Sequence, residues 1–174
     1  MGDLKLTSSA FSDGGEIPRE CGYKNGNKVP PLTVSGIPEG TKSLALIMDD
    51  PDAMEPAGKV WVHWVVWNII PDRVQMDGGD ITPMYNSAIA AECELGMTDF
   101  GEVDYGGPAP PDKTHTYVFK LYALDSKLDL PRPEFDASGN VLRIAEVGST
   151  KADVEKAMEG HILEQATLTG TYAP

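Results

Sequence analysis

The chain has 174 residues, of which 41% are hydrophobic, enough to fold around a core rather than remain disordered. Its formal net charge of −13 opposes binding to nucleic acid and to anionic membrane surfaces, because both carry the same sign of charge. It contains 14 prolines and 18 glycines, which favours many short strands joined by turns over a bundle of helices.

Cysteine content and the first residues bear on the cellular compartment. Cys21 and Cys93 are too few for a disulfide framework, so we expect free thiols, although one bridge between them stays open. The N-terminal residues lack the apolar stretch of a signal peptide, and no run is apolar enough to span a membrane. We therefore expect a cytoplasmic protein without membrane insertion. No repeat or linker divides the chain, so residues 1–174 are expected to form a single domain.

Two apolar runs predict neighbouring buried strands. Residues 42–48, KSLALIM, form a compact apolar segment that Pro51 ends. Residues 59–69, KVWVHWVVWNI, are apolar on both faces, as in a central strand covered on both sides. Alternation puts Val60, Val62, Trp64 and Val66 on one face and Trp61, His63, Val65 and Trp67 on the other.

The second half of the chain adds a strand, a helix and a closing strand. Residues 115–124, HTYVFKLYAL, alternate so that His115, Tyr117, Phe119 and Leu121 share one face. Thr150 and Asp153 fit a capping box, which predicts a helix over 151–165 with His161 on its apolar side. Residues 167–172 alternate like a strand. The stretch from Arg73 to Asp104 has no clear assignment. The sum predicts an all-β protein, a β-sandwich with one or two short helices.

The candidate chemistry lies around two strand ends and one loop. Asp50 and Asp52 flank Pro51 where the first buried strand ends, and His63 lies inside the next one. His115 and Tyr117 follow the loop YGGPAPPDKTH. An aspartate beside proline commonly only caps a turn, and a lone histidine on an apolar strand is commonly a core residue. The three tryptophans, Trp61, Trp64 and Trp67, also fit a core.

Taken together, these residues suggest an anion pocket. A buried imidazole needs hydrogen-bond partners, and a nearby carboxylate both supplies one and favours the charged ring. We therefore expect Asp50 and Asp52 to orient and charge His63 and His115, which face the anion together with backbone N–H groups near Ala109 to Pro111. On this mechanism, affinity falls as the pH rises through the histidine pKa values.

Other chemistries have less support. The sequence has no G-x-S-x-G elbow, P-loop, C-x-x-C or H-E-x-x-H motif. Two histidines and an aspartate could hold a metal, but their spacing matches no compact ligand motif, and we expect neither metal nor cofactor. Paired carboxylates for glycoside hydrolysis stay open without positive support. We expect no enzyme activity, and an unrecognised hydrolase is the last-ranked alternative.

Five ordered blocks resemble the phosphatidylethanolamine-binding protein (PEBP) family in its bacterial and archaeal branch. The blocks are AFSDGGEIPRE, NGNKVPPLTVSGIPEGTKSLALIMDDPDA, WVHWVVWNI, DFGEVDYGGPAPP with HTYVFKLYALD, and GHILEQATLTGTY. They span nearly the whole chain. The resemblance implies a Greek-key β-sandwich with a small pocket for phosphate-like groups and phospholipid headgroups. The implied ligand-binding residues are Asp50, Asp52, Trp61, His63, Gly107, Pro108, Ala109, Pro110, Pro111, His115 and Tyr117.

Three departures from the family pattern bear on this pocket. Met54 stands where a proline is usual, and methionine can fill an apolar wall. Thr116 replaces the arginine of the His-Arg-Tyr triplet, which removes one cation. The glycine common before the histidine is also missing. These changes predict weaker selection for charge.

Two functions follow from the resemblance. The first is a non-catalytic, regulatory protein that binds a small anionic or phosphate-bearing ligand, including a lipid headgroup. The alternative is an inhibitor of a protease or kinase that acts through a surface loop. Relatives of this branch are often dimers, which leaves a homodimer open, although the sequence does not show the oligomeric state.

Overall fold

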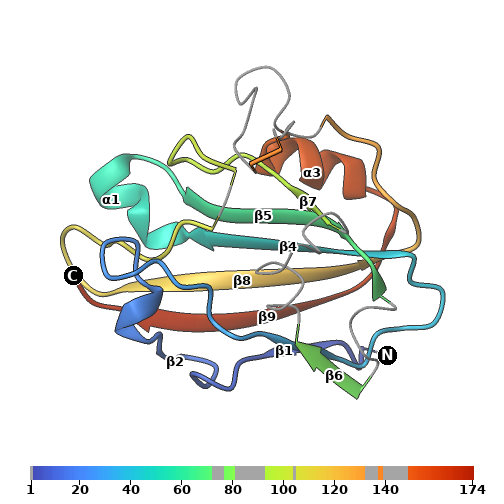
Figure 1. Ribbon diagram of the computed structural model, residues 1–174, viewed down its shortest axis with the longest axis horizontal. Coiled ribbons are helices and arrows are strands. Elements are labelled where there is room, and N and C mark those ends of the chain that lie inside the picture. The colour runs from blue at the N-terminus through green and yellow to red at the C-terminus, as the bar shows by residue number, and fades with distance from the viewer. Residues whose placement is uncertain (1, 72–76, 81–92, 104, 132–136, 139–148) are drawn as a thin grey trace.

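The computed structural model describes residues 2–71, 77–80, 93–103, 105–131, 137–138 and 149–174, whose strands form two sheets (Figure 1). The larger sheet has the order β2-β9-β8-β4-β5-β7 and the smaller one β1-β3-β6. The strands are β1 (Lys5–Thr7), β2 (Gly15–Glu16), β3 (Thr33–Ser35), β4 (Ser43–Asp50), β5 (Trp61–Ile69), β6 (Asp77–Asp80), β7 (Glu94–Leu95), β8 (His115–Leu124) and β9 (Ile162–Tyr172). The helical segments are η1 (Arg19–Cys21), η2 (Pro51–Ala53), α1 (Met54–Ala57) and α3 (Lys151–Met158).

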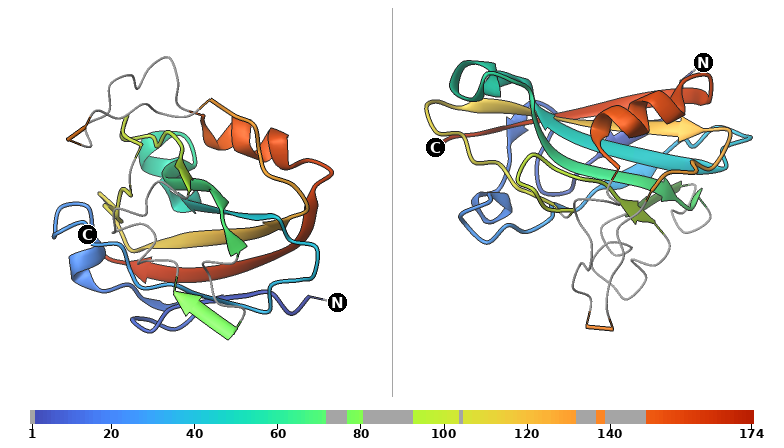
Figure 2. Two further views of the ribbon diagram at one scale, coloured as in Figure 1. Left: turned by 45° about the vertical axis from the view of Figure 1, so that its right-hand side comes forward. Right: turned by 90° about the horizontal axis from the view of Figure 1, so that it is seen from above.

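The predicted β-sandwich with short helices is confirmed. The long strands β4, β8 and β9 run side by side in both views of Figure 2. Strand β4 is buried along its whole length, because alternate residues enter two different apolar clusters. Leu44, Leu46 and Met48 face the smaller sheet, whereas Ala45 and Ile47 face α3. The predicted strand over 115–124 agrees with β8.

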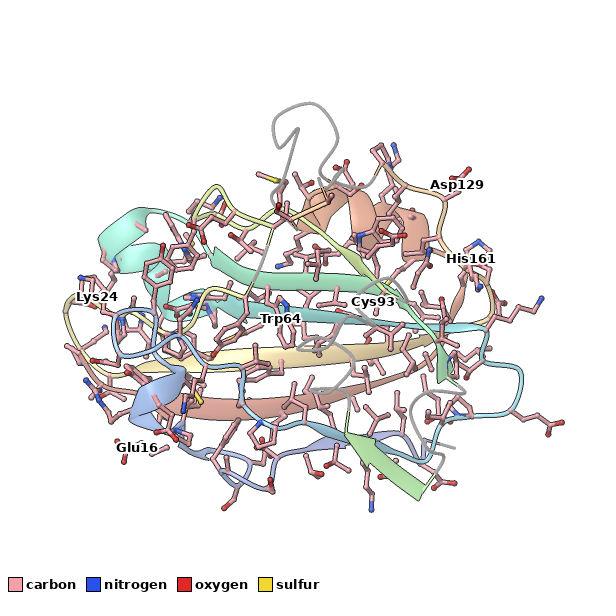
Figure 3. All side chains as sticks on the ribbon, in the orientation of Figure 1. Glu16, Lys24, Trp64, Cys93, Asp129 and His161 are labelled. Atoms are coloured by element: carbon pink, nitrogen blue, oxygen red, sulfur yellow. The ribbon has the colours of Figure 1, made fainter. Side chains whose placement is uncertain are left out.

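The alternation predicted for residues 59–69 is wrong at its N-terminal end, because β5 contains a bulge. Met48 and Asp49 pair with Trp64 and Val62, so His63 has no partner on β4. Val62 packs with Val65 and Trp67 on the α3 side, instead of with Trp64. The extra residue turns His63 toward Tyr117 on the other face. Trp64 is buried there, over the middle of the larger sheet (Figure 3).

The predicted C-terminal helix exists but is shorter than expected. Thr150 and Asp153 form the predicted capping box, and the helix ends at Met158. Gly160 then adopts a φ of +79°, a left-handed conformation that ends the helix, and the chain enters β9 at Ile162. His161 is therefore outside the helix, with its Nδ1 2.8 Å from Asp125 Oδ1 at the end of the sheet (Figure 3). Pairing of β9 with β8 over its whole length outweighs the helical pattern of residues 162–165.

The two cysteines are buried and are not joined by a disulfide, as expected. Burial raises the pKa of the Cys21 thiol to about 11, so it stays protonated at neutral pH. In the part of the chain that the structure describes, no helix has the length and apolar character needed to cross a membrane. The unassigned stretch from Arg73 to Asp104 lies partly outside the described residues, and its described part contains β6 and β7.

Asp49 joins the larger sheet to α3 through a buried carboxylate. Its Oδ2 lies 2.8 Å from Lys151 Nζ at the start of α3 and 3.1 Å from Lys120 Nζ on β8. The aspartate is 3% exposed, whereas the two lysines are 20% and 30% exposed. If the carboxylate is removed, the two lysine ammonium groups can therefore turn toward water, which limits the loss of folding stability.

We predict that Asp49→Asn lowers the free energy of unfolding by about 1.5–3 kcal/mol, the usual range for hydrogen bonds to a charged group. Urea denaturation measures the change. Glu55→Gln is the matched control, since Glu55 contacts Lys113 at an exposed site and should matter by less than about 0.5 kcal/mol. Equal effects of the two substitutions would contradict the role given to Asp49.

Candidate functional site

A cavity of about 210 Å³ lies at the end of the larger sheet that carries α1 (Figure 1). It brings together both predicted histidines with Asp50, Trp61, Ala109 and Pro111. The volume lies below the ~300–1,000 Å³ of sites for drug-sized molecules, so it suits a small chemical group. The full lining consists of Asp50, Ala53, Pro56, Ala57, Trp61, His63, Phe100, Ala109, Pro111 and His115.

Several predicted site residues do not line this cavity. They are Asp52, Gly107, Pro108, Pro110 and Tyr117. Asp52 has a structural contact instead, because its Oδ2 accepts a hydrogen bond of 2.8 Å from the backbone N–H of Thr116. Pro108 and Pro110 line a neighbouring space of about 280 Å³ beside Arg19. Met54 is 54% exposed and is not part of the apolar wall.

His115 is held between two carboxylates. Its Nδ1 lies 2.6 Å from Asp50 Oδ2 and its Nε2 lies 2.7 Å from Asp112 Oδ1. Burial opposes a charge on the ring, but the hydrogen bonds to both aspartates outweigh it and raise the pKa of His115 above its ordinary value of 6.5. This arrangement favours the imidazolium form, and both of its N–H groups already have acceptors.

His63 has a different environment, and the expectation that carboxylates would charge both rings is wrong for it. Its Nδ1 lies 2.7 Å from the carbonyl oxygen of Gly106, and its backbone carbonyl accepts from the Gly106 N–H at 2.9 Å. A carbonyl oxygen can only accept, so Nδ1 carries the proton. Burial among aromatic rings lowers the pKa of His63 despite the nearby Asp50. This histidine is therefore neutral at neutral pH.

Phe100 completes the cavity wall, although no sequence pattern identified it as a site residue. Its ring meets those of Trp61 and His63 edge to face, at centroid distances of 5.7 and 5.3 Å. Asp99 positions the ring, because its Oδ2 accepts from the Val62 N–H at 2.7 Å while its own N–H donates to the Val62 carbonyl. Gly106 must lack a side chain, since a Cβ there would collide with the Phe100 ring.

Asn27 fixes the segment that holds His63. Its Nδ2 donates to the Tyr105 carbonyl at 2.9 Å, and its Oδ1 accepts from the Gly107 N–H at 2.7 Å. The two bonds flank Gly106, the partner of His63. The second of these bonds occupies the backbone N–H of Gly107. The prolines at 108, 110 and 111 have no backbone N–H. From Gly107 to Pro111, Ala109 therefore has the only backbone N–H that can serve a ligand. The several loop donors predicted from the sequence thus become one.

The Tyr117 hydroxyl is buried beside the cavity. Its oxygen is fully buried and makes no hydrogen bond of good geometry within the described residues. Burial and the charge of Asp50 raise the pKa of Tyr117, while the Ala109 amide acts in the opposite direction. Asp50 and Ala109 both line the cavity, so the hydroxyl lies directly behind them. An unsatisfied buried hydroxyl costs about 1–3 kcal/mol, which a ligand could recover.

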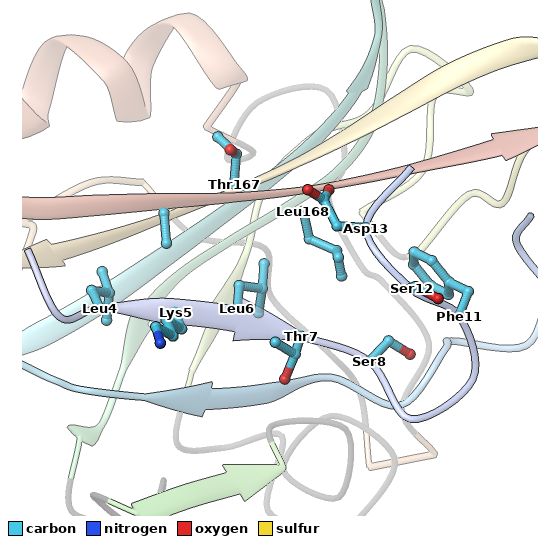
Figure 4. Close-up of a pocket in the computed structure, with 11 residues that line it drawn as sticks. Leu4, Lys5, Leu6, Thr7, Ser8, Phe11, Ser12, Asp13, Thr167 and Leu168 are labelled. Atoms are coloured by element: carbon cyan, nitrogen blue, oxygen red, sulfur yellow. The ribbon is translucent and has the colours of Figure 1, made fainter. Parts of the chain in front are cut away.

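A larger groove of about 500 Å³ lies between β1 and β9 (Figure 4). Leu4, Leu6, Phe11 and Leu168 give it a mainly apolar wall. Its one carboxylate, Asp13, accepts from both the N–H and the hydroxyl of Thr169 at 2.8 and 2.9 Å. The groove lacks the histidines and the unsatisfied hydroxyl of the smaller cavity, which we therefore take as the candidate site.

Comparison with known proteins agrees with this fold. The family model described as phosphatidylethanolamine-binding protein matches residues 7–173. The chain belongs to this family. A UPF0098 protein of Methanothermobacter thermautotrophicus is 40% identical over 97% of this chain and 98% of its own length. The family resemblance found in the sequence is thus confirmed.

Solved structures of relatives support the same fold. The crystal structure of the PEBP homolog CT736 from Chlamydia trachomatis is 34% identical, with a TM-score of 0.75 over 97% of this chain and 96% of that one. Escherichia coli YbcL, described as a member of the mammalian PEBP family, is 29% identical with a TM-score of 0.75, and 98% of each chain is covered.

The pKa values of the two cavity histidines are shifted in opposite directions. We predict that long-range ¹H–¹⁵N NMR at pH 7 shows His63 neutral with its proton on Nδ1 and His115 protonated on both nitrogens. As the pH falls, His63 should gain its second ring proton with a midpoint below its ordinary pKa of 6.5, and His115 with a midpoint above it, because the two pKa values are lowered and raised respectively. His63→Asn assigns the signals. A doubly protonated His63 at pH 7 would contradict the geometry.

Proposed function

We propose that this PEBP-family protein is a non-catalytic binding protein for a small oxyanion, such as a phosphate group or a carboxylate. The observation that supports this proposal is the unsatisfied Tyr117 hydroxyl behind Asp50 and Ala109. Ala109 lines the cavity, and the Tyr117 hydroxyl lies behind this wall, in contact with the Ala109 backbone and with Asp50. An oxygen atom of an anion that reached this wall would be a natural acceptor for these donors.

His115 contributes its charge to this site, and Asp112 already occupies its outer nitrogen. The carboxylate of Asp112 lies 2.7 Å from Nε2 and is 36% exposed, so it can turn away into water. An incoming oxyanion that displaced the Asp112 carboxylate would contact the same nitrogen, Nε2 of His115. This contact supports the proposal, because the group that Nε2 of His115 already contacts is itself an anionic carboxylate, that of Asp112.

The biological use of such a site remains part of the proposal. We place the protein in the cytoplasm as a regulatory single-domain protein and leave a homodimer open. Inhibition of a protease or kinase through a surface loop, the alternative expectation, would survive a His63→Ala, His115→Ala double substitution. Ligand-dependent regulation through the cavity would be lost in that variant.

Removing the hydroxyl alone tests the proposal. We predict that Tyr117→Phe weakens the binding of inorganic phosphate about tenfold, because one hydrogen bond to a charged group is lost. Isothermal titration calorimetry measures the affinity. The free energy of unfolding should change little, since the hydroxyl makes no hydrogen bond of good geometry with the described residues.

Tyr122→Phe is the matched control, because Tyr122 lies on the same strand but packs in the α3-side cluster. It should leave phosphate affinity unchanged. Failure of the unmodified protein to bind either phosphate or acetate at millimolar concentration would overturn the proposal, as would equal losses in the two variants.

A further inference from the structure

The outer side of β9 is only partly covered by β2. Strand β2 pairs with β9 near its C-terminal end, and Gly14 extends this contact by donating to the Thr169 carbonyl at 2.9 Å. The Thr169 N–H then donates to the Asp13 side chain at 2.8 Å instead of to a neighbouring strand. From this carboxylate toward the start of β9, no described residue makes a backbone hydrogen bond to the outer side of the strand.

Two residues of β9, Gln165 and Thr167, have unused backbone groups on this side. In an antiparallel strand, the N–H and C=O groups of every second residue point to the same side. Those of Thr169 point away from β8, and the register between β8 and β9 is regular from Glu164 to Tyr172. The groups of Gln165 and Thr167 therefore point away from β8 as well. Both residues are exposed, so this open edge, residues 165–167, can accept a further strand.

The groove between β1 and β9 lies beside the open edge and gives it an apolar floor. Thr167 is part of the groove lining. The side chains of Leu4, Leu6 and Leu168 lie between the two strands (Figure 4). The groove volume of about 500 Å³ is typical of sites for drug-sized molecules, which gives room for a few side chains. A strand added to β9 would therefore place alternate side chains over apolar surface while its backbone pairs with the edge.

The charges along this edge favour a basic partner over a second copy of the chain. Glu164 lies at one end of the open edge, and Asp13 and Glu16 lie toward the other. Lys5 is the one cation among the described residues that line the groove. Two copies joined at this edge would bring the carboxylates of both together, and each copy has a net charge of −13, so electrostatic repulsion opposes self-association.

We propose that the open edge and the groove beside it form a docking site for an extended, basic segment of a partner protein, which adds one strand to the larger sheet. Backbone hydrogen bonds to Gln165 and Thr167 hold the segment. Its alternate apolar side chains enter the groove, and its lysine or arginine side chains lie near the carboxylates. The groove shares no lining residue with the small cavity, so this site does not depend on the proposed oxyanion function.

A peptide of alternating lysine and valine with blocked ends, acetyl-KVKVKVKV-amide, is the probe. N-methylation of its valines removes the N–H groups on one edge of the strand, and N-methylation of its lysines removes those on the other edge. Only one edge can face β9. Calorimetry should therefore show that one methylated peptide loses at least about tenfold in affinity and the other less than about threefold. The same peptide with glutamate in place of lysine should not bind.

Amide hydrogen exchange followed by NMR examines the same edge residue by residue. In the unbound protein the amides of Gln165 and Thr167 should exchange rapidly, whereas those of Ala166 and Leu168, which face β8, should exchange slowly. Saturation with the lysine–valine peptide should slow exchange at the first pair at least about tenfold and leave the second pair unchanged.

Thr167→Pro tests the site from the side of the protein. Proline lacks an N–H but is tolerated on a sheet edge where the N–H faces solvent, so the pairing of β9 with β8 is kept. This variant should lose at least about fivefold in peptide affinity, whereas the control Thr167→Ala, which keeps the N–H, should lose less than about twofold. If the proline variant fails to fold, the methylated peptides and the exchange measurement decide with the unmodified protein.

Several results would overturn this proposal without touching the oxyanion site. Failure of the lysine–valine peptide to bind, or equal affinities of its two methylated forms, would exclude strand pairing at this edge. Binding of the glutamate peptide would contradict the charge argument. Slow exchange at Gln165 and Thr167 in the unbound protein would mean that the edge is already covered, by a second copy if dilution restores exchange and by this chain itself otherwise.

Discussion

The buried hydrogen bond between Asp50 and His115 joins the two strands on which the site depends. Asp50 ends β4 and His115 begins β8, and the contact of 2.6 Å fixes these ends against each other. Desolvation makes a buried ion pair a weak source of stability, so its value here lies in position. It fixes one wall of the cavity. The neighbouring aspartates act elsewhere: Asp49 holds α3 and Asp52 holds the Thr116 amide.

The strands were predictable because their residues alternate or are apolar over a length typical of strands. The match between residues 115–124 and β8, and the capping box at Thr150, come from rules that act within a few residues. The convergence of Asp50, His63 and His115 was predicted from the hydrogen-bond needs of buried imidazoles and from the family resemblance, and not from periodicity. The two predictions that were wrong, the alternation of β5 and the length of the C-terminal helix, depended on long-range strand pairing. The bulge at His63 exists only in the register with β4, and the helix end at Met158 follows from the pairing of β9 with β8.

The histidines show why residue types alone did not give the electrostatics of the site. The sequence placed two aspartates and two histidines near one another, and symmetrical pairing was the simplest arrangement. The bulge instead directs His63 to the Gly106 carbonyl, which Asn27 holds from both sides. Two imidazoles in one cavity therefore differ in protonation: the surroundings of one favour the cation, with both N–H groups engaged, and the other is neutral. Asn27 is 78 and 80 residues from its two partners, so no local pattern reveals this.

These contacts change the physical basis expected for ligand recognition. With a net charge of −13 and no lysine or arginine among the described residues that line the cavity, the protein gains little from long-range attraction of anions. Selectivity must then come from the directions of a few buried donors and acceptors, which act only at hydrogen-bond distance. A site of this kind discriminates by the pattern of hydrogens on the ligand more than by its charge, because each mismatched polar group remains buried without a partner. The loss of the family's arginine at Thr116 is consistent with this, since the only contact at that position that reaches a site aspartate is the backbone N–H.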